Sequence, residues 1–167
     1  MIAFEPLAEA DLPLIETWLR REHVARWWRD PLEVAVEKRR AAIEGRRDVD
    51  HYLIVLDGRP VGMIQTYVVA DHPDWDEIVQ VGPDAAGVDL FIGEPDLVGV
   101  GVGPRVLDEF VRRVVFVRPR TTAAVATVEE PNRRSWRAFE KAGFRHVRDV
   151  EEDGLPHRLL RRDRAPG

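Results

Sequence analysis

The chain has 167 residues, of which 44% are hydrophobic and 33% are charged, with a net charge of −5 and no cysteine. This length fits one domain over residues 1–167, and the acidic balance argues against nucleic acid as a partner. The lack of cysteine excludes disulfides, thiolate metal sites and a cysteine nucleophile, and we expect no metal. No apolar run approaches the roughly 20 residues that span a bilayer, and the N-terminus shows no secretion signal, so we expect a cytoplasmic protein with no membrane partner.

The N-terminal part of the chain carries signals for a strand and two helices. Ile2–Phe4 fits a strand, and Asp11 fits the N-cap of a first helix. The apolar residues of that helix fall on one face: Leu12, Ile15, Trp18 and Leu19. After a link at His23–Arg29, a second helix is predicted to start in a capping-box-like sequence, Asp30-Pro31-Leu32-Glu33, and to close at Gly45.

A hairpin and an acidic segment follow. Two apolar segments, Tyr52–Leu56 and Val61–Val69, flank Asp57-Gly58, a pair that is typical of tight hairpin turns. The next stretch, Asp71–Pro83, is polar, and we expect it to be irregular. It surrounds Trp75 with acidic residues and predicts an acidic rim between strands: Asp71, Asp74, Asp76 and Glu77.

Residues 87–114 predict a strand, a turn, a glycine-rich loop and a helix. Val88, Leu90 and Ile92 alternate along the sequence with Asp89 and Phe91, as expected for a strand whose successive side chains point to opposite faces. Gly99, Gly101 and Gly103 then alternate directly before an amphipathic helix, in which Pro104 fits the first turn. Its apolar residues recur at helical spacing: Val106, Leu107, Phe110, Val111 and Val114.

The glycine loop has the chemistry of a phosphate site. Glycines at the start of a helix let a ligand approach backbone N–H groups that have no partner within the helix. Two familiar phosphate loops are excluded, because neither a Gly-Lys-Ser/Thr sequence nor the Gly-x-Gly-x-x-Gly spacing is present. The alternative is that the three glycines only allow tight turning and close packing.

The C-terminal part predicts three strands around one short helix. Thr121–Val128 fits a strand, Asn132–Ala142 a helix ended by Gly143, and Phe144–Val150 a further strand. A turn at Asp153-Gly154 then leads to a last short strand near His157–Leu160.

Two segments resemble the GNAT superfamily of acyl-CoA-dependent N-acyltransferases. Val98–Gly103 is similar to its pyrophosphate loop, Gln/Arg-x-x-Gly-x-Gly/Ala, although Val98 stands where Gln or Arg is usual. Asn132–Phe144 is similar to Asn-x-x-(Ala/Ser)-x-x-x-(Tyr/Phe)-Glu-Lys-x-Gly-Phe of the same superfamily. The resemblance implies an α/β fold with a mixed, mostly antiparallel sheet, a splayed parallel pair formed by the fourth and fifth strands, and flanking helices.

The same resemblance implies acetyl-CoA as the co-substrate. A bulged fourth strand would hydrogen-bond the pantetheine arm and polarise the thioester, the glycine loop would hold the pyrophosphate, and an asparagine would contact the cofactor near its sulfur. The implied cofactor-binding residues are Leu90, Phe91, Ile92, Val98, Gly99, Val100, Gly101, Val102, Gly103 and Asn132.

Asp89 is the candidate catalytic residue. A carboxylate in an otherwise apolar strand is costly to bury unless it is paired, and function is one reason to keep it. A primary amine at neutral pH is mostly an ammonium, so a carboxylate that binds it and accepts its proton makes it reactive. The alternative is that Asp89 faces water on the polar side of the strand.

Further matches resemble the aminoglycoside 6'-N-acetyltransferases, in the same order along the chain. They are a double tryptophan after the first helix, a Pro-Val-Gly-x-x-Gln-Thr-Tyr strand, an Asp-Trp-acidic loop, and a Gly-Val-Asp strand before the glycine loop. The substrate would be a small polycationic amine, with acids for its ammonium groups and aromatic rings for its sugars. The implied substrate-binding residues are Trp27, Trp28, Gln65, Tyr67, Trp75, Asp76 and Glu77.

One departure and three alternatives remain. Many superfamily members have a tyrosine in the asparagine-initiated helix to protonate the leaving thiolate, whereas this chain has Phe139.

Acylation of a protein N-terminus or of a siderophore lysine would fit the same superfamily. A domain without catalysis that senses CoA or a drug belongs to a different class, and Asp89 favours an enzyme over it.

Overall fold

The computed structural model describes all residues, Met1–Gly167, in two compact units. Unit 1 comprises Met1–Thr66 and Asp89–Val100, and unit 2 comprises Tyr67–Val88 and Gly101–Gly167. Two strands, β3 (Arg59–Val68) and β4 (Ala85–Ile92), contribute residues to both units. The strand order is β1-β2-β3-β4-β5-β7-β6, with β4 and β5 parallel and the β1/β2, β2/β3, β5/β7 and β6/β7 pairs antiparallel. This confirms the predicted mixed α/β sheet.

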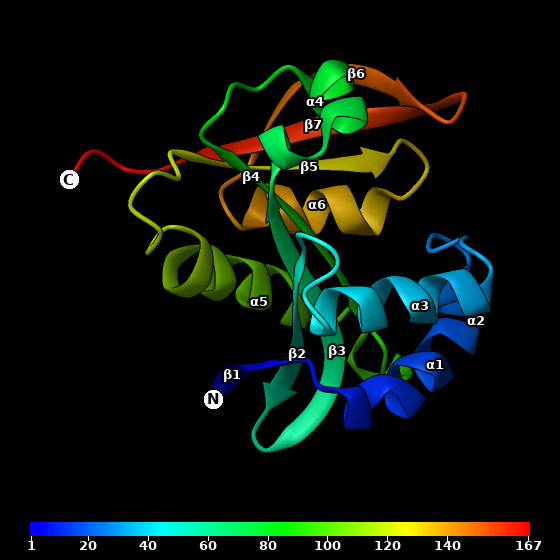
Figure 1. The fold of residues 1–167 in the computed structure, drawn as a ribbon. Helices are drawn as coiled ribbons and strands as arrows, with labels where there is room; N and C mark the ends of the chain where they lie inside the picture. The colour runs from blue at the N-terminus through cyan, green and yellow to red at the C-terminus, as the bar shows by residue number, and fades with distance from the viewer. The chain divides into compact units, whose positions relative to one another are not determined.

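Unit 1 is built from a three-stranded antiparallel arrangement with helices on one face (Figure 1). Besides its parts of β3 and β4 it contains β1 (Ile2–Pro6), η1 (Glu9–Asp11), α1 (Leu12–Arg20), α2 (Glu22–Ala25), α3 (Leu32–Ile43), β2 (Asp50–Leu56) and η3 (Pro95–Leu97). The β2–β3 hairpin turns at Asp57 and Gly58, both with positive φ, as a two-residue hairpin turn with matching twist requires. The predicted hairpin is therefore confirmed.

The core of unit 1 lies between the helices and the sheet. The predicted apolar face of α1 is buried against Leu53 and Met63 of the sheet: Leu12, Ile15, Trp18 and Leu19. Gly93, just after β4, allows Trp18 to pack closely, because a Cβ there would lie 2.2 Å from the indole ring. Burial of these large side chains supplies most of the stabilisation of such a layer, at about 1.5–3 kcal/mol each.

Two expectations for the α1–α3 region were wrong. The predicted link after α1 is partly helical, because Glu22–Ala25 forms the short helix α2. The predicted capping box before α3 does not form: Pro31 is the N-cap, and the Asp30 carboxylate instead accepts a hydrogen bond from Lys38 at 2.7 Å. The end of α3 is as predicted, with Gly45 at a φ of 75°.

Unit 2 surrounds the β4–β5–β7–β6 part of the sheet. It contains η2 (Val69–Asp71), α4 (Pro73–Val79), α5 (Val102–Phe110), the π-helical turn η4 (Val111–Val115), β5 (Ala123–Glu129), α6 (Arg133–Lys141), β6 (Arg145–Glu152) and β7 (Leu155–Asp163). The last strand is longer than predicted, because its register with β5 runs from Ala123↔Asp163 to Glu129↔His157. The parallel register of β4 and β5 covers three pairs, Ala85↔Ala123 to Gly87↔Val125.

The acidic stretch after β3 is ordered rather than irregular, which corrects the prediction. Pro73 starts α4, Val79 anchors it as a buried residue, and Gln80 ends it in the left-handed conformation. Proline suits the first helical turn, since its missing N–H would have no partner there. The acidic residues of this stretch therefore have fixed positions on a helix.

Two burial patterns also differ from the predicted periodicity. Val115 is fully buried, whereas Val114 is only half-buried, because the π-helical turn after α5 advances the inward-facing position by one residue. In β4, Val88 and Phe91 are both buried although they are three residues apart. Burial therefore does not follow a period of two in the strand that carries Asp89.

Candidate active site

Asp89 lies in unit 1, where it is half-buried and paired with a neighbouring strand. Gln65 of β3 donates a hydrogen bond from Nε2 to Oδ2 of Asp89 at 3.1 Å. Because an ionised carboxylate only accepts hydrogen bonds, this contact fixes the orientation of the Gln65 amide. The structure therefore brings two of the predicted site residues together and ties the candidate catalytic carboxylate to the sheet.

The two adjacent tryptophans have different surroundings. Trp28 packs edge-on against Phe91 of β4, with ring centroids 5.3 Å apart, and its other neighbour is the guanidinium of Arg39 at 5.5 Å. Trp27 instead lies under Arg26 at 5.3 Å and Arg29 at 5.9 Å. Trp28 thus packs against the strand that carries Asp89, whereas Trp27 contacts the guanidinium groups of two arginines close to it in the sequence.

Two buried polar residues beside this strand pair were missed in the sequence. Arg39 of α3 is 4% exposed and His51 of β2 is 6% exposed. His51 lies directly opposite Gln65 in the β2–β3 register. For Arg39, the helical spacing in the sequence could have indicated burial. Arg39 stands four residues after Ala35, which is buried, and therefore lies on the same face of α3.

Short contacts also fix the end of β4. His23 donates from Nε2 to the Ile92 carbonyl at 2.9 Å, so this carbonyl already has a partner within the chain. The carboxylate of Glu94 accepts hydrogen bonds from Trp18 Nε1 at 3.0 Å and from Arg21 at 2.9 Å. The Trp18 hydrogen bond lowers the pKa of Glu94, and Arg21 lowers it further. Of the backbone groups expected to meet pantetheine, the Ile92 C=O is therefore engaged.

The glycine loop has the backbone geometry that a phosphate site needs. Gly99 and Gly101 have φ values of 76° and 86°, in the left-handed region that side chains disfavour. Gly101 is exposed, and α5 begins at the next residue, Val102. The first N–H groups of this nine-residue helix have no helical acceptor, and the helix dipole adds positive potential there.

Asn132 occupies the N-cap position of α6, yet its side chain does not cap the helix. Asparagine at this position usually accepts a hydrogen bond from a backbone N–H of the first turn. The half-buried amide of Asn132 is therefore available for another partner.

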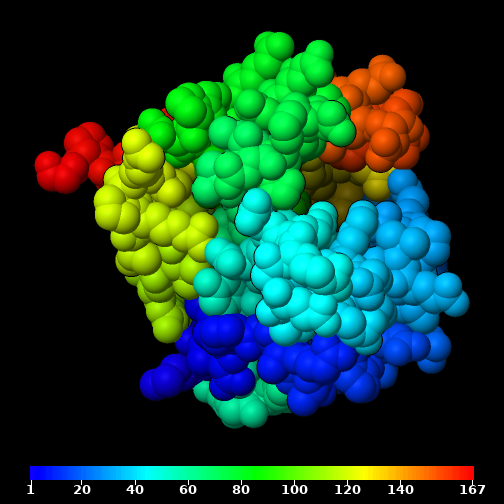
Figure 2. All heavy atoms as spheres, in the orientation of Figure 1, coloured from blue at the N-terminus to red at the C-terminus, as the bar shows by residue number.

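The acidic helix α4 of unit 2 is joined to the turn between β6 and β7. Trp75 donates from Nε1 to Oε1 of Glu152 at 3.0 Å, and its ring packs edge-on against Tyr67 at 5.5 Å. Figure 2 shows the atoms of this segment (green) against those of the β6–β7 turn (orange). Asp76 and Glu77 lie on the same helix, half-buried and exposed respectively. Trp75 thus has a structural contact through its N–H, while its ring stays partly exposed.

We predict that Trp75→Phe lowers the free energy of unfolding by about 1.5–3 kcal/mol, the usual net contribution of a hydrogen bond to a charged group. Urea unfolding measures this change. Trp27→Phe is the matched control, because it makes the same change in size where the indole N–H has no hydrogen bond. Equal losses in the two variants would contradict a stabilising Trp75–Glu152 bond.

Glu130 and Phe139 have structural surroundings in unit 2. Arg158 donates to Glu130 Oε2 at 2.9 Å and stacks 3.9 Å above the Trp136 ring. Phe139, at the position where many superfamily members have tyrosine, is buried against Phe144 with ring centroids 5.0 Å apart. These contacts explain both residues without a catalytic role.

No group of three or more histidine, aspartate and glutamate side chains is arranged to hold a metal ion. No helix is both long and apolar enough to cross a membrane.

Similar proteins match this arrangement. The aminoglycoside N(6')-acetyltransferases type 1 of Klebsiella pneumoniae and Serratia marcescens are each 29% identical to the chain over 145 residues, covering 83% of this chain and 71% of theirs. The structure of the aminoglycoside acetyltransferase AAC(6')-Ib in complex with coenzyme A and kanamycin is similar with a TM-score of 0.88 and 27% identity, covering 98% of this chain and 95% of that one. AAC(6')-Ib in complex with paromomycin and acetyl-CoA has a TM-score of 0.87 and 27% identity, with 98% and 93% covered.

Residues 8–152 match the acetyltransferase (GNAT) domain family. This range contains the strand of Asp89, the glycine loop and the helix that Asn132 begins. The chain therefore belongs to the GNAT acetyltransferase family.

Proposed function

We propose that this chain transfers the acetyl group of acetyl-CoA to a primary amine of an aminoglycoside, and specifically to its 6'-amine. The observation that carries the proposal is the half-buried Asp89, held by Gln65, in the strand that leads into the glycine loop. Similarity to aminoglycoside N(6')-acetyltransferases supports the choice of substrate. The reaction joins the amine nitrogen to the acetyl carbon and releases the CoA thiol.

For the cofactor, the proposed roles follow the order of the chain. The backbone of Leu90–Ile92 would bind pantetheine, the loop Val98–Gly103 the pyrophosphate, and the Asn132 amide the region of the sulfur. The left-handed glycines and the uncapped Asn132 side chain support these roles. Val98 stands where the family pattern has Gln or Arg. Because the loop would bind mainly through backbone N–H groups, this difference would weaken phosphate binding without abolishing it.

For the acceptor, Asp89 would bind the substrate ammonium and take its proton, directly or through water. In unit 1, the residues proposed to meet substrate rings and ammonium groups are Trp27, Trp28 and Gln65. In unit 2, the residues proposed for the same role are Tyr67, Trp75, Asp76 and Glu77. Trp28 and Trp75 are the better supported aromatics, because Trp27 is flanked by two arginines that would repel a cation. No residue is assigned as the acid for the thiolate, since Phe139 is buried; a thiol with a pKa of about 8.5 can leave without one.

The acids of α4 should act in binding rather than in chemistry. We expect Asp76→Asn and Glu77→Gln each to raise KM for the aminoglycoside by about two- to five-fold, because a partly exposed charge pair contributes about 0.2–1 kcal/mol. The kcat and the KM for acetyl-CoA should stay unchanged. Glu44→Gln, an exposed acid at the end of α3, is the control. Unchanged kinetics in both α4 variants with every amine tested would show that these acids form a solvated surface.

The test of the proposed function uses two substrates that differ at one atom. Neomycin carries an amine and paromomycin a hydroxyl at the 6' carbon, and the two are otherwise the same. Thiol release from acetyl-CoA should be fast with neomycin and absent with paromomycin, and NMR of the neomycin product should show the acetyl group on the 6' nitrogen. Turnover with neither compound would refute the aminoglycoside assignment, and equal turnover would refute the 6' position.

We further propose that residues 1–167 form a single GNAT domain that works in the cytoplasm. The family match runs through residues of both units, which supports one domain. Cytoplasmic action would give the enzyme access to acetyl-CoA, its proposed donor.

A further inference from the structure

Arg39 is a buried cation without an ion-pair partner. It projects from α3 and is 4% exposed, and none of its hydrogen bonds or ring contacts involves a carboxylate. Its Nη1 donates to the Ala35 carbonyl at 2.8 Å, and its Nε contacts the sulfur of Met63 at 3.5 Å. A buried charge without a counter-ion costs several kcal/mol, so its retention requires an explanation.

The neighbours of Arg39 belong to the strand pair that carries Asp89. Met63 and Gln65 are two residues apart on β3 and so share a face of the sheet, as do Asp89 and Phe91 on β4. Gln65 bonds Asp89, and Trp28 bridges Arg39 to Phe91. Arg39 is therefore linked to the strand pair of Asp89 through Met63 on β3 and through Trp28, which packs on Phe91 of β4.

The charged groups around Arg39 favour Asp89 as its counter-ion. The pKa of Arg39 is lowered to about 10, mainly by burial and also by Arg47, while Asp30 and Asp89 oppose this shift. Asp30 is exposed and already pairs with Lys38 at 2.7 Å, so solvent weakens its effect. Arg39 remains charged at neutral pH.

His51 does not compete for this role. The pKa of His51 is lowered to about 3, mainly by burial and also by Arg39 and Arg47. Neither ring nitrogen has a hydrogen-bond partner. His51 is thus neutral at physiological pH, and of the two buried residues only Arg39 carries a positive charge.

We propose that Arg39 is a positioning residue for Asp89, whose buried guanidinium keeps the Asp89 carboxylate charged and aligned to receive the substrate ammonium. The part that concerns substrate rests on the proposed function, whereas the coupling between Arg39 and Asp89 does not. Arg39 touches neither substrate nor cofactor in this role and acts only through the carboxylate.

The test replaces Arg39 by an uncharged residue of similar length. Arg39→Met keeps the packing against Trp28 and Met63, and apolar replacement of a buried ion is often neutral for stability. Removing the positive charge should move the midpoint of the Asp89 titration, and with it the acidic limb of kcat/KM, about one unit to higher pH. The Asp89 carboxyl carbon, assigned by its loss in Asp89→Asn, is followed by ¹³C NMR.

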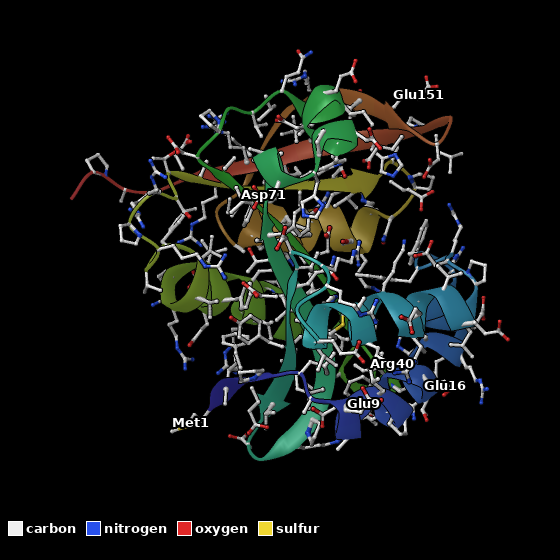
Figure 3. The ribbon with its side chains drawn as sticks, viewed as in Figure 1. Met1, Glu9, Glu16, Arg40, Asp71 and Glu151 are labelled. Carbon is white, nitrogen blue, oxygen red and sulfur yellow. The ribbon has the colours of Figure 1, made fainter.

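Two variants serve as controls. Arg39→Lys keeps the charge and should restore most of the shift. Arg40→Met removes the next arginine of α3, which is half-buried and paired with Glu9 at 3.1 Å (Figure 3), and should leave the midpoint unchanged. A purely structural role for Arg39 would alter stability without moving the midpoint.

The outcomes separate this inference from the proposed function. If Arg39→Met shifts the midpoint of the Asp89 titration but the wild-type chain acetylates no aminoglycoside, the coupling between Arg39 and Asp89 is supported and the proposed function is refuted. An unmoved midpoint in folded Arg39→Met would overturn the coupling, whatever the activity. Should Arg39→Met fail to fold, the wild-type chain decides: the ¹⁵Nε signal of Arg39 should change over the pH range in which Asp89 titrates, and independent titrations would overturn the inference.

Discussion

Gly101→Asp should reduce acetyl-CoA affinity by about 100-fold or more while the chain stays folded. The new carboxylate would stand at the left-handed position directly before α5, where the pyrophosphate is proposed to bind. Two like charges about 4 Å apart repel by about 4 kcal/mol at an effective dielectric constant of about 20. Calorimetry of CoA binding measures the loss.

The matched control is Gly101→Asn. A Cβ at Gly101 meets no atom within 4 Å, so both side chains fit, and both must adopt the φ of 86°. Asparagine tolerates that conformation and has nearly the size of aspartate without its charge. A loss confined to the aspartate variant would assign it to repulsion of phosphate. Unchanged CoA affinity in folded Gly101→Asp would remove the basis of the cofactor assignment.

The sequence predicted the fold well where local signals agree with packing. The Asp57-Gly58 turn, the apolar face of α1 and the end of α3 at Gly45 all formed as expected, because turn chemistry and periodicity act over a few residues. Prediction failed where tertiary contacts decide. Residues 73–79 became helical because Trp75 and Val79 pack against the sheet of unit 2. The turn after α5 widened, so that Val115 became buried.

The candidate site was predicted only in part, because contacts between distant segments also decide which of its residues meet. Asp89 stood out as one charge in an apolar strand, and Gln65 was found as a motif residue, yet nothing local indicated that the two would bond across β3 and β4. Arg39 and His51 were missed because charged and polar residues in α3 and β2 usually face solvent. The burial of His51 depends on strand register, which no short pattern encodes, whereas for Arg39 only its helical spacing from Ala35 gave a signal.

Asp89→Asn should lower kcat/KM by about 10²- to 10⁴-fold, the usual contribution of a general base. Asparagine keeps the size of the side chain, and acetyl-CoA affinity should stay unchanged because the glycine loop is intact. Glu5→Gln, an exposed acid in β1, is the control and should have wild-type activity. A chain that binds CoA or drug only as a sensor would show no turnover before or after the change.

The pH profile of Asp89→Asn separates its two proposed roles. If Asp89 takes the amine proton, rising pH deprotonates the amine in solution and should restore part of the rate of the variant. If Asp89 only anchors the ammonium, the anchor is missing at every pH and the variant should gain nothing beyond the wild-type profile. Gln65 would bond the new amide through its own carbonyl after a flip, so the strands should remain paired. Wild-type turnover of Asp89→Asn across the whole range would exclude both roles, and the half-buried carboxylate would then serve the β3–β4 pairing alone.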